Sequence, residues 1–244
     1  MINYDFSGKE ILITGGISGI GLETAKKFSE LGGKVTITYR RNSSFENYKK
    51  LSKDQYDISI QKLDITNELS IEQLYKKIDR LDILVNNATL IKGGVEYRVE
   101  NFSDVVNVNL MGVMRVCHMF MPKLALSEGN IINVTSANVK LPLATAPSYI
   151  ATKAGIESLT KSMASCWAEH KLRVNSVAPG WIETNTTNIL KKDMHNFSNI
   201  LERIPLRRIG KAVDVANTVI FLSSNMATYI TGSTIFVDGG FSIN

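Results

Sequence analysis

Short runs of apolar residues alternate with longer amphipathic stretches along the whole chain. Runs of four to six residues with little polar alternation predict strands buried on both faces of a parallel sheet. They cover residues 9–14, 35–38, 58–63, 82–85, 131–135, 173–178 and 234–237. Between them, apolar residues at helical spacing predict helices over 20–31, 45–52, 69–78, 102–126, 148–169 and 213–222.

This alternation of strand and helix predicts an α/β fold, a doubly wound parallel sheet with helices on both faces. Met121-Pro122 can mark a bend in the long helix, and residues 185–210 are polar without a clean period. Because no linker, repeat or low-complexity segment interrupts the pattern, we expect one domain over residues 1–244.

A glycine cluster, Thr14-Gly15-Gly16-Ile17-Ser18-Gly19-Ile20-Gly21, joins the first strand to the first helix. Such a turn aims free backbone N–H groups and the positive end of the helix dipole at one point, which suits an anion. The glycines allow a tight turn and the close approach of a pyrophosphate. We weigh a nucleotide site above the alternative of an ordinary tight turn.

The chemistry-bearing candidates are Tyr149, Lys153 and Ser136. Tyr149 and Lys153 are four residues apart, so on one helix they share a face. A neighbouring ammonium favours the phenolate and lowers the pKa of a tyrosine towards the range useful for proton exchange. Ser136 follows the fifth strand, where its hydroxyl could hold a carbonyl oxygen beside the phenol. Alone, this spacing also fits an exposed helical tyrosine.

Composition narrows the partners. The formal charge of +5 is modest and its lysines are scattered, which argues against nucleic-acid binding but suits an anionic cofactor. We interpret Cys117 and Cys166 as core residues. Three unclustered histidines argue against a metal site. The N-terminus lacks an apolar signal region and no stretch could span a bilayer, so we expect a cytoplasmic protein without membrane contact.

Taken together, these marks resemble the short-chain dehydrogenase/reductase family over nearly the whole chain. They are residues 14–21, Asp64, Asn86-Asn87-Ala88, Asn109, Ser136, Tyr149-x-x-x-Lys153 and Pro179-Gly180. The resemblance implies a Rossmann-type fold and four catalytic residues. Tyr149 would exchange the proton, Ser136 would orient the reacting oxygen, Lys153 would lower the Tyr149 pKa and bind the nicotinamide ribose, and Asn109 would hold a relay water.

The resemblance also implies a set of cofactor contacts. Asp64 would lie near the adenine, and Thr184 at the nicotinamide end. The full set is Gly15, Ile17, Ser18, Gly19, Ile20, Gly21, Arg40, Arg41, Asp64, Ile65, Asn86, Ala88, Tyr149, Lys153, Pro179, Gly180, Ile182 and Thr184. Structural roles stand equally for Asn109, as a helix brace, and for Asp64 and Thr184, as caps. Thr89 departs from the family's usual glycine, which affects the expected pocket shape.

The second predicted strand ends at Tyr39-Arg40-Arg41, where NAD-type members usually carry an acidic residue. A guanidinium is forked and permanently charged, so it suits a 2′-phosphate, and we expect NADP(H) to be favoured over NAD(H). The alternative is that Arg40 and Arg41 are ordinary solvated side chains with no role in cofactor binding. Ser18 weakens the prediction, because many NADP-type relatives have arginine there.

Within the family the likeness is greatest to 3-oxoacyl-[acyl-carrier-protein] reductases, on residues 174–184, 229–232 and 238–240. The expected reaction interconverts a carbonyl and a secondary alcohol, and the substrate could be a carrier-bound acyl group. His170-Lys171 and Arg207-Arg208 could receive an acidic carrier. A sugar or polyol dehydrogenase and a non-catalytic nucleotide-binding scaffold are the alternatives.

We also expect a homotetramer, or at least a dimer. Two helices carry more apolar residues than one sheet-facing stripe needs. These residues are Val113, Val116, Met119, Phe120, Leu159, Met163 and Trp167. The alternative is that loops of the same chain cover them.

Overall fold

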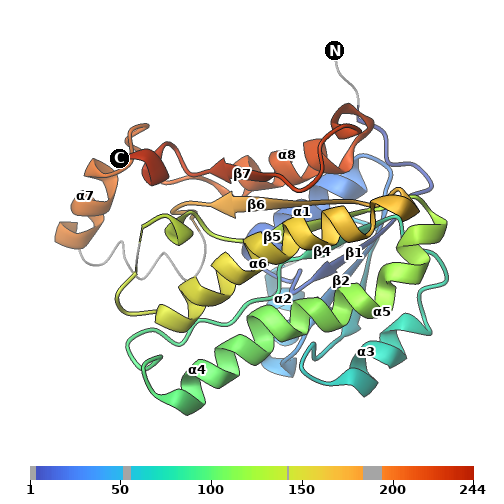
Figure 1. Ribbon diagram of the computed structural model, residues 1–244, viewed down its shortest axis with the longest axis horizontal. Helices are drawn as coiled ribbons and strands as arrows, with labels where there is room; N and C mark the ends of the chain where they lie inside the picture. The colour runs from blue at the N-terminus through green and yellow to red at the C-terminus, as the bar shows by residue number, and fades with distance from the viewer. Residues whose placement is uncertain (1–3, 52–55, 142, 184–193) are drawn as a thin grey trace.

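Seven parallel strands form one sheet in the computed structural model, which describes residues 4–51, 56–141, 143–183 and 194–244 (Figure 1). Their order is β3-β2-β1-β4-β5-β6-β7. The strands are β1 (Glu10–Thr14), β2 (Lys34–Tyr39), β3 (Ile58–Lys62), β4 (Ile83–Asn86), β5 (Asn130–Val134), β6 (Arg173–Pro179) and β7 (Thr234–Val237). Strand order reverses between β1 and β4, and the carboxyl edge at such a point is where open α/β sheets bind ligands.

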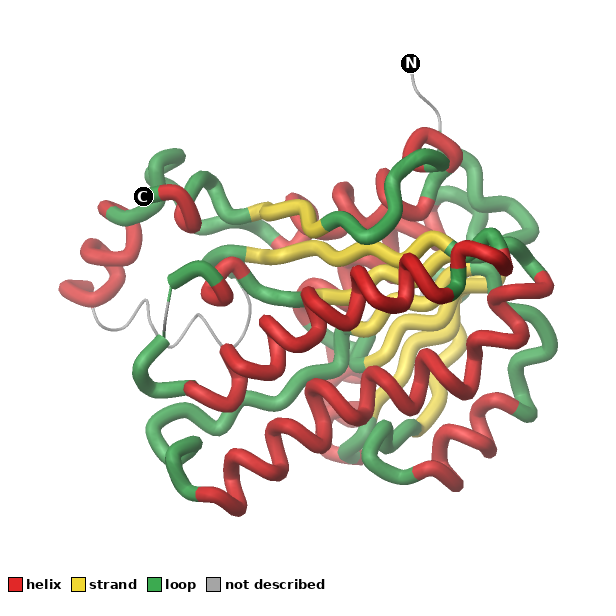
Figure 2. The backbone as a smooth tube through the Cα atoms, in the orientation of Figure 1, coloured by secondary structure: helices red, strands yellow, loops and turns green. Residues whose placement is uncertain are grey.

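Helices cover both faces of this sheet, as Figure 2 shows, so the predicted doubly wound single-domain fold is confirmed. They are α1 (Gly19–Glu30), α2 (Asn42–Leu51), α3 (Glu68–Tyr75), α4 (Val99–Val106), α5 (Val113–Leu126), α6 (Pro147–Cys166), α7 (Met194–Glu202) and α8 (Ala212–Ser223). Among the described residues, no helix is both long and apolar enough to cross a membrane.

Two hydrophobic cores lie on the opposite faces of the sheet. Leu84 packs into the core beneath α3, α5 and α6, where Phe120 is fully buried. Its strand neighbours Ile83 and Val85 point the other way, into the core beneath α1 and α8 around Phe28. Alternate residues of one strand therefore enter different cores, which explains its continuous apolar sequence.

The predicted long helix over 102–126 differs from the structure in its start and its irregularity. Helix begins at Val99, and a π-helical turn, η1 (Asn107–Gly112), separates α4 from α5. Pro122 lies inside α5, so the departure from α geometry falls at η1 instead of at Met121-Pro122. Asn109 in this turn bonds to the backbone of Leu90, a tertiary contact that sequence period does not report. α7 lies within the stretch that showed no clean period.

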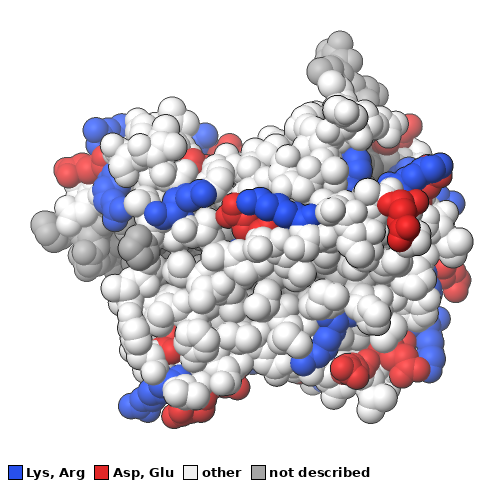
Figure 3. All heavy atoms as spheres, viewed as in Figure 1, with Lys and Arg blue, Asp and Glu red and all other residues white. Residues whose placement is uncertain are grey.

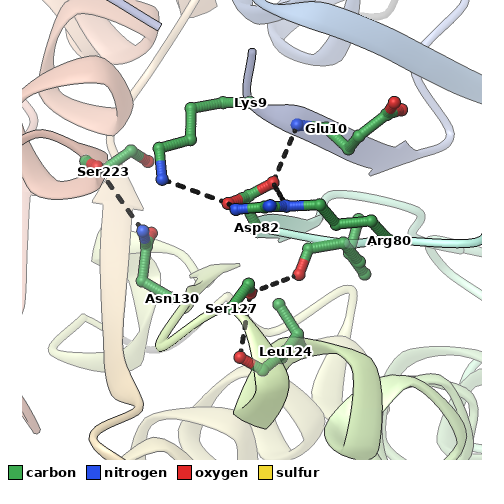
Figure 4. A network of polar contacts seen from close by, with 9 residues as sticks. Lys9, Glu10, Arg80, Asp82, Leu124, Ser127, Asn130 and Ser223 are labelled. Atoms are coloured by element: carbon green, nitrogen blue, oxygen red, sulfur yellow. Dashed lines mark hydrogen bonds and ion pairs between the residues drawn. The ribbon is translucent and has the colours of Figure 1, made fainter.

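A buried carboxylate, Asp82, braces the amino ends of the central strands, opposite the carboxyl edge (Figure 4). Its side chain is 2% exposed and accepts hydrogen bonds from Lys9 Nζ at 3.1 Å and from Arg80 Nε and Nη2 at 3.0 and 2.8 Å. The backbone N–H of Glu10 adds a fourth, at 3.1 Å. This network ties the start of β1 to that of β4.

Asp82→Asn is therefore expected to destabilise the fold by about 2 kcal/mol, because an amide nitrogen would face donors that now bond to a carboxylate. Urea unfolding measures the loss, and kcat should stay unchanged because the network lies at the far end of the sheet. Glu72→Gln is the matched control: its exposed pair with Lys76, at 2.6 Å, should be worth less than ~0.5 kcal/mol. Equal stability of the Asp82 variant and wild type would contradict the bracing role.

Candidate active site

A cleft of about 800 Å³ opens at the carboxyl edge of the sheet. Residues from the ends of β1, β2, β4, β5 and β6 line it, together with α6. Of the predicted site residues, it brings together Gly15, Ile17, Ser18, Gly19, Ile20, Arg40, Arg41, Ile65, Ala88, Ser136, Tyr149, Lys153, Pro179, Gly180 and Ile182. Thr184 lies outside the described residues.

The glycine turn between β1 and α1 is held close to the end of β4. Gly15 has φ +64°, and a Cβ there would lie 2.8 Å from Ala88 Cα, so no larger residue fits without displacing backbone. The amide of Asn87 donates to the carbonyl oxygens of Thr14 at 3.2 Å and Gly15 at 2.9 Å. Gly21 does not line the cleft. A Cβ there would lie 2.5 Å from Asn87 Nδ2 and 3.0 Å from Gly15 O, so glycine lets the start of α1 lie close to the glycine turn and Asn87.

The charge of this half of the cleft suits an anionic ligand. The first turn of α1 has no acidic residue, and its N-cap, Ser18, makes no side-chain cap bond. The helix dipole therefore presents partial positive charge that no local side chain cancels. Arg40 and Arg41 follow β2 and add two exposed guanidinium groups to the same wall. These residues fit the pyrophosphate and adenosine end of a dinucleotide.

Ser136, Tyr149 and Lys153 meet further along the cleft. Ser136 follows β5 and caps the short turn η2 (Ala137–Val139), so its Oγ accepts from Asn138 N at 3.2 Å. Its hydroxyl proton is not used in that bond, and the hydroxyl lies near enough to the Tyr149 side chain to lower the pKa of the phenol. Lys153, one turn along α6, donates from Nζ to Val134 O at 2.7 Å and lies 5.7 Å from the Tyr149 ring centroid.

Burial dominates the electrostatics of this pair. Burial raises the pKa of Tyr149, the Ser136 hydroxyl lowers it, and the charge of Glu96 raises it, with a net upward shift. Burial also lowers the pKa of Lys153 to about 8. The sequence predicted a lowered Tyr149 pKa through Lys153. In the protein alone the shift has the opposite direction, because desolvation outweighs the lowering by the Ser136 hydroxyl.

Asn109 is braced on all sides instead of facing the cleft. It is 1% exposed, accepts from Leu90 N at 2.7 Å and contacts Thr89 Oγ1 at 3.3 Å. Its amide nitrogen donates to Leu90 O at 2.8 Å and Thr152 Oγ1 at 3.3 Å. Every hydrogen-bonding position of this amide is thus engaged, which favours the brace over the relay water. Thr89, the departure from the family pattern, belongs to this brace and lines the cleft.

Two more predicted contacts lie outside the cleft lining. Asn86 is buried and donates to Asn133 Oδ1 at 2.9 Å and Cys117 Sγ at 3.1 Å. Asp64 Oδ1 accepts from Thr66 N and Oγ1 at 2.9 and 2.6 Å. Burial acts to raise the Asp64 pKa, but these bonds and the charge of Arg40 make the net shift downward. Asp64 thus shapes the turn, while Asn67 caps α3.

Thr38 and Asn87 are among the cleft residues that sequence reasoning did not assign to the site. Thr38 Oγ1 accepts from Gly15 N at 3.1 Å, so the end of β2 supports the glycine turn. Both line the cleft. Position at the carboxyl end of a central strand is the signal that could have found them, because those ends gather at one edge.

Comparison with known proteins gives the family. The family model described as enoyl-(acyl carrier protein) reductase matches residues 15–242. The 3-oxoacyl-[acyl-carrier-protein] reductase FabG of Staphylococcus epidermidis is 36% identical over 242 residues, covering 95% of this chain and 98% of its own. The chain belongs to the short-chain dehydrogenase/reductase family. The FabG protein of Thermotoga maritima is 37% identical over 248 residues, covering 97% and 98% of the two chains.

A solved structure supports the same assignment. A candidate 2-deoxy-D-gluconate 3-dehydrogenase of Agrobacterium tumefaciens, with bound NADP, superposes with a TM-score of 0.88 and 32% identity, covering 100% of both chains. This short-chain dehydrogenase/reductase is therefore an oxidoreductase, and the glycine turn, the uncapped α1 and the two arginines fit a nicotinamide dinucleotide.

Proposed function

We propose that the protein reversibly reduces a ketone to a secondary alcohol with NADP(H), and that Tyr149 is its general acid and base. The observation that carries this proposal is that Ser136, Tyr149 and Lys153 line one cleft, which continues to the glycine turn. Two hydroxyl groups directed at one point can hold and protonate a single oxygen, which is what carbonyl reduction requires of the protein.

When bound, the cofactor supplies or accepts the hydride; the protein positions the substrate and moves the proton. Ser136 Oγ accepts from Asn138 N, so its own proton is available to the substrate oxygen. Tyr149 Oη gives its proton to that oxygen as negative charge develops there. The raised Tyr149 pKa keeps the phenol protonated at neutral pH, the form that reduction needs. Lys153 would hold the nicotinamide ribose from the buried side of α6.

We propose NADP(H) as the preferred cofactor because Arg40 and Arg41 line the cleft beyond β2. The NADP-bound relative supports this preference. Arg40→Ala should raise the KM for NADPH roughly tenfold or more and leave that for NADH unchanged, since a charge-assisted hydrogen bond is worth ~1.5–3 kcal/mol. Arg98→Ala, an exposed position before α4, controls for net charge. An unchanged NADPH KM, or better kcat/KM with NADH in the wild type, would contradict this choice.

We propose a 3-oxoacyl thioester as the substrate class. Part of the cleft wall is apolar, with Leu90, Ile91, Leu143 and Trp181 among its lining residues. Such a wall suits an acyl chain better than a polyol, although the gluconate-type relative keeps a sugar acid as the second candidate. For carrier docking, Lys171 pairs with Glu128 at 2.5 Å and Arg208 with Asp214 at 2.8 Å. One residue of each candidate basic pair, His170-Lys171 and Arg207-Arg208, therefore already has an acidic partner.

The test is NADPH oxidation by the purified protein over a panel of 3-oxoacyl thioesters, enoyl thioesters and sugar acids. Turnover of the 3-oxoacyl compounds with the highest kcat/KM is the expected result. Preference for enoyl thioesters would overturn carbonyl reduction in favour of double-bond reduction, and preference for a sugar acid would overturn the substrate class alone. Absence of turnover over the whole panel would favour the scaffold alternative.

We also propose a homotetramer. Four of the seven apolar residues that suggested it, Val113, Val116, Phe120 and Met163, are buried within the subunit. What supports assembly is the remaining surface: Met119, Leu159 and Trp167 are only partly covered, and charged side chains are sparse over α5 and α6 in Figure 3. A solution mass by light scattering of 27.0 kDa, that of one chain, would contradict assembly.

A further inference from the structure

Glu96 is a fully buried carboxylate that belongs to no part of the proposed chemistry. It lies in the loop between β4 and α4 and is 0% exposed. Its Oε1 accepts from the backbone N–H groups of Lys92 at 2.7 Å and Gly93 at 3.3 Å. Its Oε2 accepts from Ser148 Oγ at 2.5 Å and from the backbone N–H of Tyr149 at 2.9 Å. One carboxylate thus joins a loop to the first turn of α6.

The start of α6 has no cap of its own. Its N-cap residue is Ala146, which has no side-chain acceptor, and Pro147 in the first position has no N–H. The N–H of Tyr149 would otherwise be an unpaired donor in a partly buried turn. Glu96 satisfies it from 53 residues away, with a charge that the helix dipole favours at this end.

The same loop forms part of the cleft wall. Leu90 and Ile91 line the cleft, and Gly94 N donates to Thr145 O at 2.6 Å, just before α6. The contacts of Glu96 and Gly94 therefore hold the wall and the start of α6 as one unit. Displacement of this first turn would move the Tyr149 hydroxyl relative to Ser136.

We propose that Glu96 is a positioning residue: its carboxylate locks the first turn of α6 to the cleft wall, so that the Tyr149 hydroxyl is held beside Ser136. This inference rests on the proposed function, because it takes Tyr149 as the acid. A misplacement of about 1 Å at a reacting group costs on the order of 10²-fold in rate.

The negative charge of Glu96 should also affect the pH dependence of kcat, which gives a second measurement of its role. Two ionisable side chains face Tyr149 from the packed elements: Lys153 from α6 itself and Glu96 from the β4–α4 loop. Burial is the largest influence on the Tyr149 pKa, and the Glu96 charge adds to its upward shift. Without that charge the phenol should ionise at lower pH, so the fall of the reductive kcat at alkaline pH should begin earlier.

The experiment compares Glu96→Gln with wild type, with Glu100→Gln as the matched exposed control and with Tyr149→Phe in parallel. In Glu96→Gln the reductive kcat should fall ~10- to 10²-fold, the NADPH KM should stay within about twofold, and the alkaline limb should move to lower pH. Glu100→Gln should behave as wild type. A folded Glu96→Gln variant with a wild-type kcat, or with a reduced kcat and an unmoved limb, would overturn the proposal.

A second variant covers the case in which Glu96→Gln does not fold. Ser148→Ala removes the 2.5 Å bond but keeps the carboxylate and its charge. Its kcat should fall several-fold at constant NADPH KM, and a wild-type kcat would overturn the positioning role. Near-normal activity of Tyr149→Phe would contradict the proposed function itself. An inactive Tyr149→Phe beside an unaffected Glu96→Gln would sink the positioning role alone.

Discussion

Replacing Tyr149 by phenylalanine is expected to give a folded protein that binds NADPH normally and reduces its substrate at least ~10²-fold more slowly. A positioned acid contributes roughly 10²–10⁴-fold to a proton-transfer step, and this substitution removes only the hydroxyl. Steady-state kcat and KM measure the loss, which should fall on kcat because the missing interaction matters mainly in the transition state. Tyr229→Phe, at a fully exposed position, should have no effect.

The direction in which the wild-type kcat changes with pH also tests whether Tyr149 is the general acid. Because burial raises the Tyr149 pKa, the phenol stays protonated at neutral pH and the reductive kcat should fall only on the alkaline side. The oxidative direction needs the phenolate, so its rate should rise with pH over the same range. The apparent pKa of this alkaline change in rate describes the coupled titration of Tyr149 and Lys153, not that of one residue alone. A reductive kcat that rises with pH would contradict Tyr149 as the acid.

Lys153→Met is expected to make the protein more stable at pH 7 and much less active. Lys153 is 4% exposed and its amine bonds to Val134 O, so a mostly protonated ammonium is held in a poorly solvated place. Its folded pKa of about 8 lies below the ordinary 10.5, a difference on the order of 3 kcal/mol against the charged form. The lost bond to Val134 O offsets part of this, which leaves a gain of ~1–2 kcal/mol.

The lowered pKa of Lys153 determines the pH range in which wild-type stability should change. Between pH 8 and 10.5 the unfolded chain binds more protons at this lysine, so wild-type stability should rise with pH there. The methionine variant has no group that titrates at this position, so its stability should not change with pH for this reason. Its gain in the free energy of unfolding over the wild type should therefore vanish by about pH 10. Urea unfolding of both proteins at pH 7 and pH 10 tests the expected gain in stability at pH 7 and its loss near pH 10. The NADPH KM and kcat of the variant are measured in parallel. A variant less stable than wild type at pH 7 would show that the charge is stabilised where it lies.

Local signals were enough to predict the sheet, the glycine turn and the helix that carries Tyr149 and Lys153. Strands such as β4 are buried on both faces, so their composition is apolar wherever their partners lie. Tyr149 and Lys153 are neighbours through helix geometry alone, and spacing in sequence reports that directly.

What the sequence did not reveal depends on contacts between distant residues. The π-helical turn η1 accompanies the bonding of Asn109 to Leu90, 19 residues away. The cap of α6 comes from Glu96, and no local pattern marks a glutamate as the partner of a remote helix. The Tyr149 pKa likewise follows mainly from burial of its side chain in the fold, which its spacing to Lys153 does not encode.

Hydride transfer to a carbonyl carbon is the central claim, and isotope transfer tests it most directly. The purified protein would be incubated with NADPH deuterated at the transferable C4 position and a 3-oxobutyryl thioester, and the product examined by mass spectrometry and proton NMR. The account predicts one deuterium on the carbinol carbon of a 3-hydroxybutyryl thioester, formed in step with NADPH oxidation. A product without deuterium at that carbon, or label found only in a saturated thioester made from an enoyl substrate, would contradict it.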